Sequence, residues 1–193
     1  MVAAEVELTD GARRILDAAS ELFYRSGIHA VGVDAIAAES GVTKRTLYNR
    51  FGSKDALVVA YLEERHRQWW ARFEERLGTA EHPRALALFD SYLGDVDDGD
   101  RGCAFINAAG ELPFSHPGYG VIRDHKARVY ERLIELVAED ELVDDPQAVA
   151  EHVYLLLEGA AAHRGIDGSD QRLVRARELA RQFLARARRP AEC

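Results

Sequence analysis

The scarcity of helix-breaking residues constrains this chain more than any other feature of its sequence. Only five prolines occur in 193 residues, and the stretches between them are rich in Ala, Leu, Glu and Arg, which favour helix. No run of β-branched residues alternates with polar ones for long enough to indicate a strand. No period of roughly 20 to 50 residues repeats. The sequence therefore predicts an all-α fold.

Turn residues and capping residues divide the chain into expected helices. The first begins near Thr9 or Asp10 and ends at Gly27, and Ser53 is a good N-cap for a long helix that runs to about Leu77. The other expected helices cover residues 33–40, 43–51, 83–96, 103–112, 118–141, 146–164 and 170–188. Links fall at Gly78 and at residues 97–100, 113–117 and 165–168.

The composition indicates a folded, soluble chain. It is 47% hydrophobic and 30% charged, a balance typical of a protein that buries a core. The first residues carry acids where a signal peptide would carry bases, and no apolar stretch reaches the ~18 residues of a membrane span. Cys103 and Cys193 match no metal-binding spacing and fit a reducing compartment. We therefore expect a cytoplasmic protein with no membrane partner, structural disulfide, metal or cofactor.

The residues from Val33 to Leu47 have the steric pattern of a helix-turn-helix. A small residue, Ala37, stands where two helix axes would cross, and Gly41 stands where the turn favours a positive φ. Ile36, Val42 and Leu47 would supply the small shared core. The pattern predicts two short helices that cross closely, with the second helix free to enter a groove of DNA.

Charge is distributed unevenly and supports this interpretation. The net charge of −8 alone argues against nucleic acid, because binding phosphate needs local positive charge. However, residues 1–54 carry seven basic and seven acidic side chains. Within them, residues 40–54 contain four bases and no acid. This basic patch coincides with the second helix of the pair, although a solvated helix face is the plain alternative.

Residues 9–60 resemble the N-terminal domain of the TetR family of transcriptional regulators. The similarity rests on Gly27, on VDAIA at 33–37, on GVTKRTLYNRF at 41–51, and on Ser53, Lys54 and Leu57. It implies a three-helix DNA-binding domain, residues 1–53, joined by a long helix to a ligand-binding and dimerisation domain, residues 54–193. It also implies a homodimer that binds a double-stranded DNA operator. Gly32 departs from the family, which usually has Ser or Thr there, so one phosphate contact is expected to be missing.

The resemblance also implies roles for the residues of the basic helix. Thr43 would cap the helix and bond a phosphate, Tyr48 would reach the backbone, and Lys54 would lie against a phosphate. Arg45 can bond O6 and N7 of guanine together, and Asn49, on the same helical face, can pair with adenine. The expected DNA-binding residues are Thr43, Lys44, Arg45, Thr46, Tyr48, Asn49, Arg50 and Lys54. Tyr48 has the alternative of packing beside Phe51.

Each of the last two expected helices has an apolar face that must pack against another part of a protein. Residues 153–162 contain a single charge, and apolar residues recur at helical spacing over 173–187. Two such helices from each subunit would form a four-helix dimer interface. The expected interface residues are Val153, Leu156, Ala160, Leu179 and Phe183. The alternative is that some of them close the core of the single subunit.

Aromatic and polar residues in the middle of the chain are candidates for a small-molecule site. Such a site is mostly apolar with a few polar anchors. The candidates are Trp70, Phe73, Tyr92, Phe105, Asn107, Glu111, Phe114, His125, Tyr154 and Glu158. Each has a structural alternative, since core aromatics are common. Cys103 could be redox-active at a helix start or could be a small core residue.

The function predicted from these features is a DNA-binding transcriptional repressor that an unidentified small-molecule effector releases from its operator. One alternative is an adaptor whose helix-turn-helix contacts protein only. A bundle enzyme is the third possibility, because Glu63 and His66 match one ligand motif of di-iron bundles. That motif must occur twice, and no second Glu-x-x-His is present. We therefore expect no catalytic residues.

Overall fold

A computed structural model describes residues 8–94, 101–140 and 143–187, and these residues form helices with no strand among them. The all-α prediction is confirmed. The elements are α1 (Asp10–Ser26), α2 (Val33–Ser40), α3 (Lys44–Phe51), α4 (Lys54–Leu77), a 3₁₀ helix η1 (Arg84–Leu86), α5 (Ala87–Leu93), α6 (Ala104–Glu111), α7 (Gly118–Asp140), α8 (Pro146–Asp167) and α9 (Gln171–Ala187).

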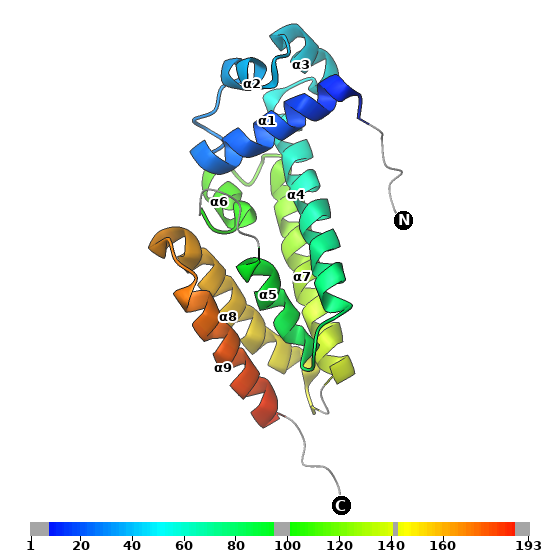
Figure 1. Cartoon of the computed structure of the whole chain (residues 1–193), viewed down its shortest axis with the longest axis vertical. Helices are drawn as coiled ribbons and strands as arrows, with labels where there is room; N and C mark the ends of the chain where they lie inside the picture. Colours follow the sequence, from blue (N-terminus) through cyan, green and yellow to red (C-terminus); the bar gives the residue numbers. More distant parts are fainter. Residues whose placement is uncertain (1–7, 95–100, 141–142, 188–193) are drawn as a thin grey trace, which may run out of the picture.

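The three N-terminal helices form one end of an elongated molecule (Figure 1). From this end α4 runs along the molecule beside α7, and α8 and α9 lie together on the other side (Figure 1). α5 packs among α4, α8 and α9, whereas α6 lies close beneath α1 (Figure 1). The long helix α4 therefore connects the N-terminal helices to the remainder of the structure.

One apolar core lies at the N-terminal end. Ile15, Phe23, Ile36 and Leu47 from the first three helices are buried there. The same core takes Leu57 and Tyr61 from α4, Phe105 and Ala108 from α6, Leu112 directly after α6, and Ile122 from α7. Apolar contacts thus continue across the domain boundary expected at residue 53, and α6 belongs to the packing of the N-terminal helices.

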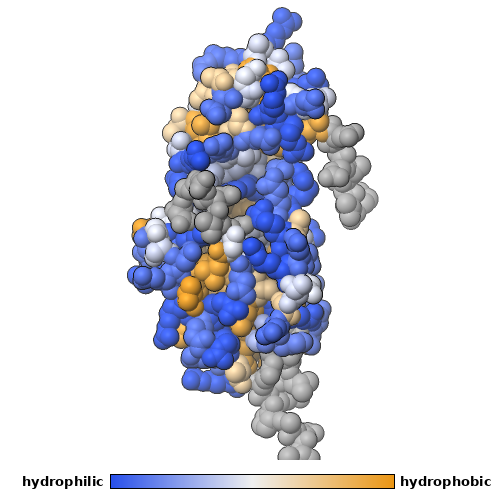
Figure 2. Space-filling view, viewed as in Figure 1, coloured by the Kyte–Doolittle hydropathy of each residue, from blue (hydrophilic) through white to orange (hydrophobic). Residues whose placement is uncertain are grey.

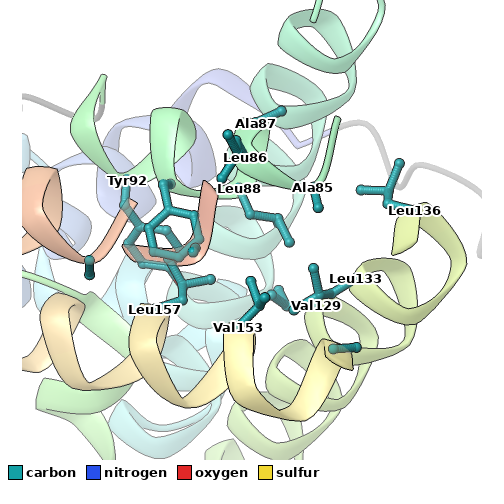
Figure 3. Close-up of a cluster of buried hydrophobic side chains, with 14 of the residues drawn as sticks. Ala85, Leu86, Ala87, Leu88, Tyr92, Val129, Leu133, Leu136, Val153 and Leu157 are labelled. Carbon is teal, nitrogen blue, oxygen red and sulfur yellow. The ribbon is translucent and has the colours of Figure 1, made fainter. Parts of the chain in front are cut away.

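A second core lies among α5, α7, α8 and α9. Leu88 of α5, Leu133 of α7 and Leu157 of α8 meet in it, and all are fully buried (Figure 3). Val153 points into this core and has no exposed surface (Figure 3), and Ala160 is buried in it as well. The subunit's own core occupies the side chain of Val153, which argues against the place at a dimer interface expected for it, whereas Ala160, 6% exposed, also lines a surface groove on α8 and α9.

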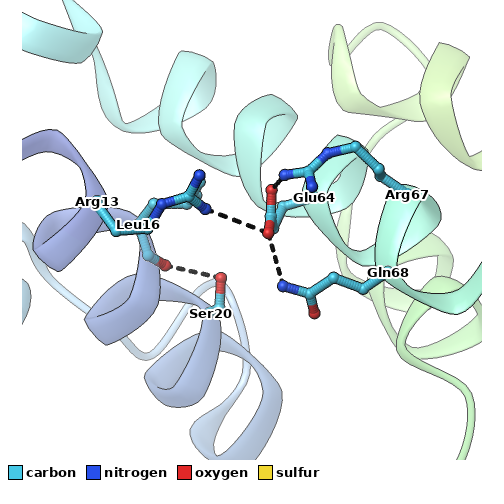
Figure 4. Close-up of polar contacts among 6 residues, drawn as sticks. All are labelled: Arg13, Leu16, Ser20, Glu64, Arg67 and Gln68. Carbon is cyan, nitrogen blue, oxygen red and sulfur yellow. Dashed lines mark hydrogen bonds and ion pairs between the residues drawn. The ribbon is translucent and has the colours of Figure 1, made fainter. Parts of the chain in front are cut away.

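A buried carboxylate fastens α1 to α4. Glu64 accepts a hydrogen bond from Arg13 Nη1 at 3.3 Å and another from Gln68 Nε2 at 2.6 Å (Figure 4). Arg67, one turn along α4, forms an ion pair with the same carboxylate (Figure 4). Because a buried carboxylate needs such partners, this cluster fixes how the first helix sits on the long one.

Two expected helices differ from those observed. The segment expected as one helix over 83–96 is η1 followed by α5, which ends at Leu93, and residues 95 and 96 lie outside the described part. The helix expected to end at residue 164 continues through Gly165 to Asp167. Gly165 serves close packing instead of termination, since a Cβ there would lie 2.5 Å from the Arg101 carbonyl oxygen. The helix ends at Gly168, whose φ is +60°.

Candidate nucleic-acid interface and central cavity

The short helices α2 and α3 form a tight pair. Gly41 ends α2 with φ +63°, a left-handed conformation that suits glycine. The backbone N–H of Val42 donates to the Ala37 carbonyl at 3.2 Å. Ile36 and Leu47 are fully buried between the helices and α1. One face of α3 is thereby fixed to the core, and its opposite face is left in solvent.

The outward face of α3 collects the expected DNA-binding side chains. Thr43, Lys44, Arg45, Tyr48, Asn49 and Arg50 are all exposed, and Thr46 is half-buried. Thr43 caps the helix, because its Oγ1 accepts a hydrogen bond from the Thr46 N–H at 3.2 Å. This face therefore offers two guanidinium groups, an amide and an ammonium to solvent.

Two lysines of this region already have partners within the protein. Lys44 forms an ion pair with Asp34 of α2. Lys54 Nζ donates a hydrogen bond of 2.6 Å to the Ile28 carbonyl, in the link between α1 and α2. An ammonium has three N–H donors, so each lysine keeps donors for a phosphate. Lys54 in addition holds the start of α4 to that link.

A small cavity lies between α4, the start of α6, and α7. Its volume is about 50 Å³. Aromatic and cationic side chains make up most of its wall. The lining residues are Tyr24, Arg65, Trp69, Arg72, Tyr92, Gly102, Cys103, Ala104, Phe105, His125 and Arg164. Three of the ten candidate ligand residues, Tyr92, Phe105 and His125, are among them.

The other candidate residues lie elsewhere. Phe73 is fully buried in the second core, and Phe114 is 85% exposed on the link between α6 and α7. Trp70 stacks with the guanidinium of Arg128, 4.5 Å from its ring centroid. Trp70, Phe73 and Phe114 do not line this cavity, and their role in ligand binding stays a prediction. Phe73 packs in the core, Trp70 pairs with Arg128, and Phe114 faces solvent.

The polar candidates outside the cavity all make contacts with protein. Asn107 donates to the Arg101 carbonyl at 2.7 Å, and Glu111 accepts from the His29 backbone N–H at 2.9 Å. The Tyr154 hydroxyl donates to the Lys126 carbonyl at 3.3 Å. Glu158 forms an ion pair of 2.7 Å with Lys126. These four residues therefore have polar partners within the protein, and their role as ligand anchors stays a prediction.

Several cavity residues were missed by the sequence reasoning. Arg65, Trp69 and Arg72 follow one another at spacings of four and three, which places them on one face of α4. This periodicity could identify them, but the expected ligand residues include Trp70 and not its neighbour Trp69. Tyr24 and Arg164 come from α1 and α8, and no spacing in the sequence brings these residues to α4.

His125 is a neutral, buried histidine in the cavity wall. Its Nδ1 lies 2.9 Å from Nδ1 of His66, and its ring stacks on Phe105 with the centroids 3.7 Å apart. Burial lowers the pKa of His125 to about 2, and the charge of Lys126 and the contact with His66 add to this effect. His125 therefore carries no charge at neutral pH.

Lys126 forms a buried polar cluster behind the cavity. Burial alone would lower the pKa of Lys126, but the nearby Cys103, Tyr92 and Glu158 raise it well above its usual value. Its Nζ lies 3.6 Å from Cys103 Sγ and 3.5 Å from the Tyr92 hydroxyl. An ammonium is therefore held next to the thiol in the cavity wall.

The cavity is connected directly to the N-terminal helices. The Tyr24 hydroxyl, on α1, donates to the Gly102 carbonyl at 3.0 Å. In return, Arg101 Nη1 donates to the Tyr24 carbonyl at 3.2 Å. A change in the position of the segment just before α6 would therefore alter its hydrogen bonds with the C-terminal end of α1.

The paired helices α8 and α9 leave apolar side chains in solvent. Leu155 is 62% exposed and Leu179 is 37% exposed. Together with Leu156 they line two adjoining surface grooves, one of which also contains Phe183. Figure 2 shows apolar side chains at the surface of the half of the molecule that α8 and α9 form. Leu155 was not among the expected interface residues.

None of the described helices is both long and apolar enough to cross a membrane. Within residues 8–94, 101–140 and 143–187, no group of three or more His, Cys, Asp or Glu side chains could hold a metal ion.

Comparison with known proteins identifies relatives of the N-terminal segment. The family described as bacterial regulatory proteins, tetR family, matches residues 15–61. The HTH-type transcriptional regulator UidR of Escherichia coli strain K12 is 39% identical over 62 residues, which are 32% of this chain and 32% of UidR. The HTH-type transcriptional activator FasR of Mycolicibacterium smegmatis is 49% identical over 95 residues, 48% of this chain and 43% of FasR. These matches span less than half of either relative.

Solved structures extend the similarity to the remaining helices. A TetR-family transcriptional regulator from Streptomyces coelicolor superimposes with a TM-score of 0.85 and 29% sequence identity, over 93% of this chain and 97% of that chain. The sequence matches therefore cover the α2–α3 pair, and the structural match also covers the helices around the cavity and the α8–α9 face.

Proposed function

The chain belongs to the TetR family of bacterial regulatory proteins, and from this premise we propose that it is a homodimeric transcriptional repressor that a small-molecule effector releases from its operator. Proteins of this family are regulators and not enzymes, which removes the bundle enzyme from consideration. Because the proposed target is the double-stranded DNA of the chromosome, we place the protein in the cytoplasm.

One observation carries the proposal, namely the basic face of α3. Leu47 fixes one side of this helix to the core, while Arg45, Asn49 and Arg50 stand exposed on the other side. A helix held in this way can enter the major groove, where guanidinium and amide groups distinguish base pairs. We assign base readout to Arg45 and Asn49. Phosphate contacts are assigned to Thr43, Lys44, Thr46, Tyr48, Arg50 and Lys54, which fix the position of the helix without reading sequence.

A dimer is needed because one recognition helix covers only a few base pairs. Two copies must place their α3 helices about 34 to 36 Å apart to reach successive major grooves on one side of the duplex. Leu155, Leu156, Leu179 and Phe183 supply an apolar surface on α8 and α9 that a second copy can cover. The operator is then expected to be roughly palindromic, as the symmetry of such a dimer requires.

Release by an effector needs a connection between the cavity and α3. The contacts of Tyr24 with residues 101 and 102, and of Glu111 with His29, provide it. A ligand acts only through a difference in its affinity for the two states. A coupling of about 1 to 3 kcal/mol would lower operator affinity about 5- to 150-fold.

A mobility-shift experiment tests the proposal. The probe is duplex DNA from the region upstream of the protein's own gene, and the control is a scrambled duplex of the same length and composition. A repressor of its own or a neighbouring gene binds the first in preference to the second. Equal weak binding to both duplexes would favour the adaptor, which contacts protein only. A reporter gene behind the same DNA gives the sign: expression falls with a repressor and rises with an activator, the function named for FasR.

A further inference from the structure

The surroundings of Cys103 favour reaction of its thiol. Cys103 immediately precedes α6, lines the central cavity and is a free cysteine within the described part of the chain. Its Sγ lies 3.6 Å from Nζ of Lys126 on α7, and Glu158 holds that ammonium in place from α8. The thiolate is the nucleophilic form of cysteine, and a cation beside the sulfur stabilises its negative charge. The thiol is thus in contact with a cavity and with a fixed positive charge.

An unpartnered hydrogen-bond donor in the same cavity indicates a ligand that carries a hydrogen-bond acceptor. Trp69 lines the cavity and is only 6% exposed. Within the described part of the chain, its indole Nε1 has no hydrogen-bond acceptor. A buried donor without a hydrogen-bond partner destabilises the folded protein. A bound molecule that offers an oxygen to this N–H would remove the cost.

The volume and the aromatic walls of the cavity further restrict which ligands can bind. A water-sized group needs about 10 to 15 Å³ of such volume, so a cavity of about 50 Å³ holds roughly four non-hydrogen atoms. Phe105 and the neutral His125 give it flat, aromatic walls. A small planar carbonyl compound fits this space, and larger ones require the walls to move.

We propose that Cys103 is a covalent modification site for small α,β-unsaturated carbonyl compounds, with acrolein as the simplest example. The carbonyl oxygen accepts a hydrogen bond from the Trp69 N–H, while Sγ attacks the β-carbon. Nothing in the assignment of the protein as a DNA-binding regulator requires this site.

The reaction balances without any further reagent. The thiol loses its proton, and the S–C bond forms at the β-carbon as the C=C π bond breaks. The electron pair moves to the carbonyl oxygen, giving an enolate that Trp69 stabilises. A proton is then taken up at the α-carbon. The product is a thioether that contains one whole molecule of the electrophile, so no oxidant is consumed and no group leaves.

The adduct would act on the N-terminal helices through the neighbouring residue. The Gly102 carbonyl receives the Tyr24 hydroxyl of α1. The segment has no spare room on its other side, since a Cβ on Gly102 would lie 2.7 Å from the Gly165 backbone nitrogen. A group added at Cys103 therefore displaces this segment and disturbs the contact with α1. That consequence, the loss of operator binding, rests on the proposed function, whereas the modification itself does not.

Mass spectrometry of the intact, folded protein treated with acrolein tests the site. The wild-type chain has its own control in Cys193, its second cysteine. We expect one adduct, located at Cys103 by peptide mapping, formed at least 10-fold faster than any adduct at Cys193. Propanal, which has the same size but no C=C bond, should give no stable adduct. Reaction at Cys103 no faster than at Cys193 would overturn the proposal.

Variants at two positions, Lys126 and Trp69, test the roles of the neighbours in the Cys193→Ser background. Lys126→Met removes the charge at nearly constant length and should slow alkylation at least 10-fold, while Lys126→Arg should restore most of the rate. Trp69→Phe keeps the ring without the N–H and should slow acrolein while leaving iodoacetamide unaffected. Circular dichroism identifies a variant that fails to fold, and the comparison of Cys103 with Cys193 in the wild type then decides. Equal rates in folded Lys126→Met and wild-type protein would contradict the role of the lysine.

Operator binding by the modified protein separates this inference from the proposed function. If the adduct forms and operator affinity falls at least 5-fold, both stand. If the adduct forms and operator affinity is unchanged, the regulatory consequence is refuted. If unmodified protein binds no operator at all, the proposed function fails while the modification site stands on its mass-spectrometric result.

Discussion

Glu111 at the end of α6 accepts a hydrogen bond of 2.9 Å from the backbone N–H of His29, in the link that follows α1. The same carboxylate packs against Gly27, where a Cβ would lie 3.0 Å from its Oε1. Gly27 has φ +91°, so glycine suits both the conformation and the close approach. α6 thus connects the cavity to the turn that leads into α2.

Replacing Glu111 should loosen this connection. Glu111→Ala removes the acceptor and should lower the free energy of unfolding by about 1 kcal/mol, the usual contribution of such a hydrogen bond. Glu111→Gln keeps an oxygen at the same position and should lose less. Urea denaturation followed by circular dichroism measures both. Equal losses for Ala and Gln would show that the hydrogen bond does not contribute.

The buried carboxylate of Glu64 should contribute more. Glu64→Ala leaves Arg13 and Gln68 without their common acceptor and should cost about 1 to 3 kcal/mol of unfolding free energy. Glu63→Ala, at the exposed neighbouring position on α4, is the matched control and should stay within about 0.5 kcal/mol of wild type. A loss as large in the control would contradict the role assigned to Glu64.

His125 predicts a pH dependence of stability. The unfolded chain takes up a proton at this residue near pH 6.5, whereas burial keeps the folded pKa at about 2. Because the unfolded state binds more protons, stability is lost as pH falls below about 6.5. Between pH 7.5 and pH 5 the contribution of His125 to this loss is about 2 kcal/mol.

The variant His125→Gln isolates that contribution. It should reduce the difference in unfolding free energy between pH 7.5 and pH 5 by about 2 kcal/mol relative to wild type, although it lowers stability at both values by disturbing the stack on Phe105. Denaturation curves at the two pH values give the difference. An unchanged difference would mean that His125 can be protonated in the folded protein.

A charged side chain introduced on the α8–α9 face should prevent dimer formation. Leu179→Arg places a charge at the centre of the two adjoining grooves and should convert the proposed dimer to monomer, because burying an unpaired charge is costly. Val174→Arg is the control on the same helix, since Val174 is 54% exposed and lies outside both grooves. Sedimentation velocity measures the result. A dimer in the first variant, or a monomer in the second, would place the interface elsewhere.

The helix-turn-helix could be predicted from the sequence because its constraints are local. Ala37, Gly41 and Leu47 lie within eleven residues, and the crossing of two short helices fixes which residue types fit. Capping by Thr43 and Ser53 follows from the same local rules, and both side chains accept the expected backbone hydrogen bonds. Turn residues and capping residues likewise predict most of the other helices.

The cavity could be predicted only in part because its wall is assembled from distant segments. Tyr24 and Arg164 are 140 residues apart, and nothing local indicates that they meet. Composition also cannot distinguish the two faces of α8. Val153 and Leu155 are both apolar and two residues apart, so they point in different directions, and only the packing against α7 shows which one is buried.

The central claim is that α3 reads DNA sequence through Arg45. Its most direct test is a set of fluorescence-anisotropy titrations of wild type, Arg45→Ala and Arg50→Ala against the operator and its single-base-pair variants. Arg45→Ala should lose about 1 to 3 kcal/mol of discrimination at one base pair of each half-site. Arg50→Ala should weaken all duplexes alike and reduce the salt dependence. If both variants weaken every duplex equally and keep the wild-type base preferences, Arg45 does not read sequence and the account is contradicted.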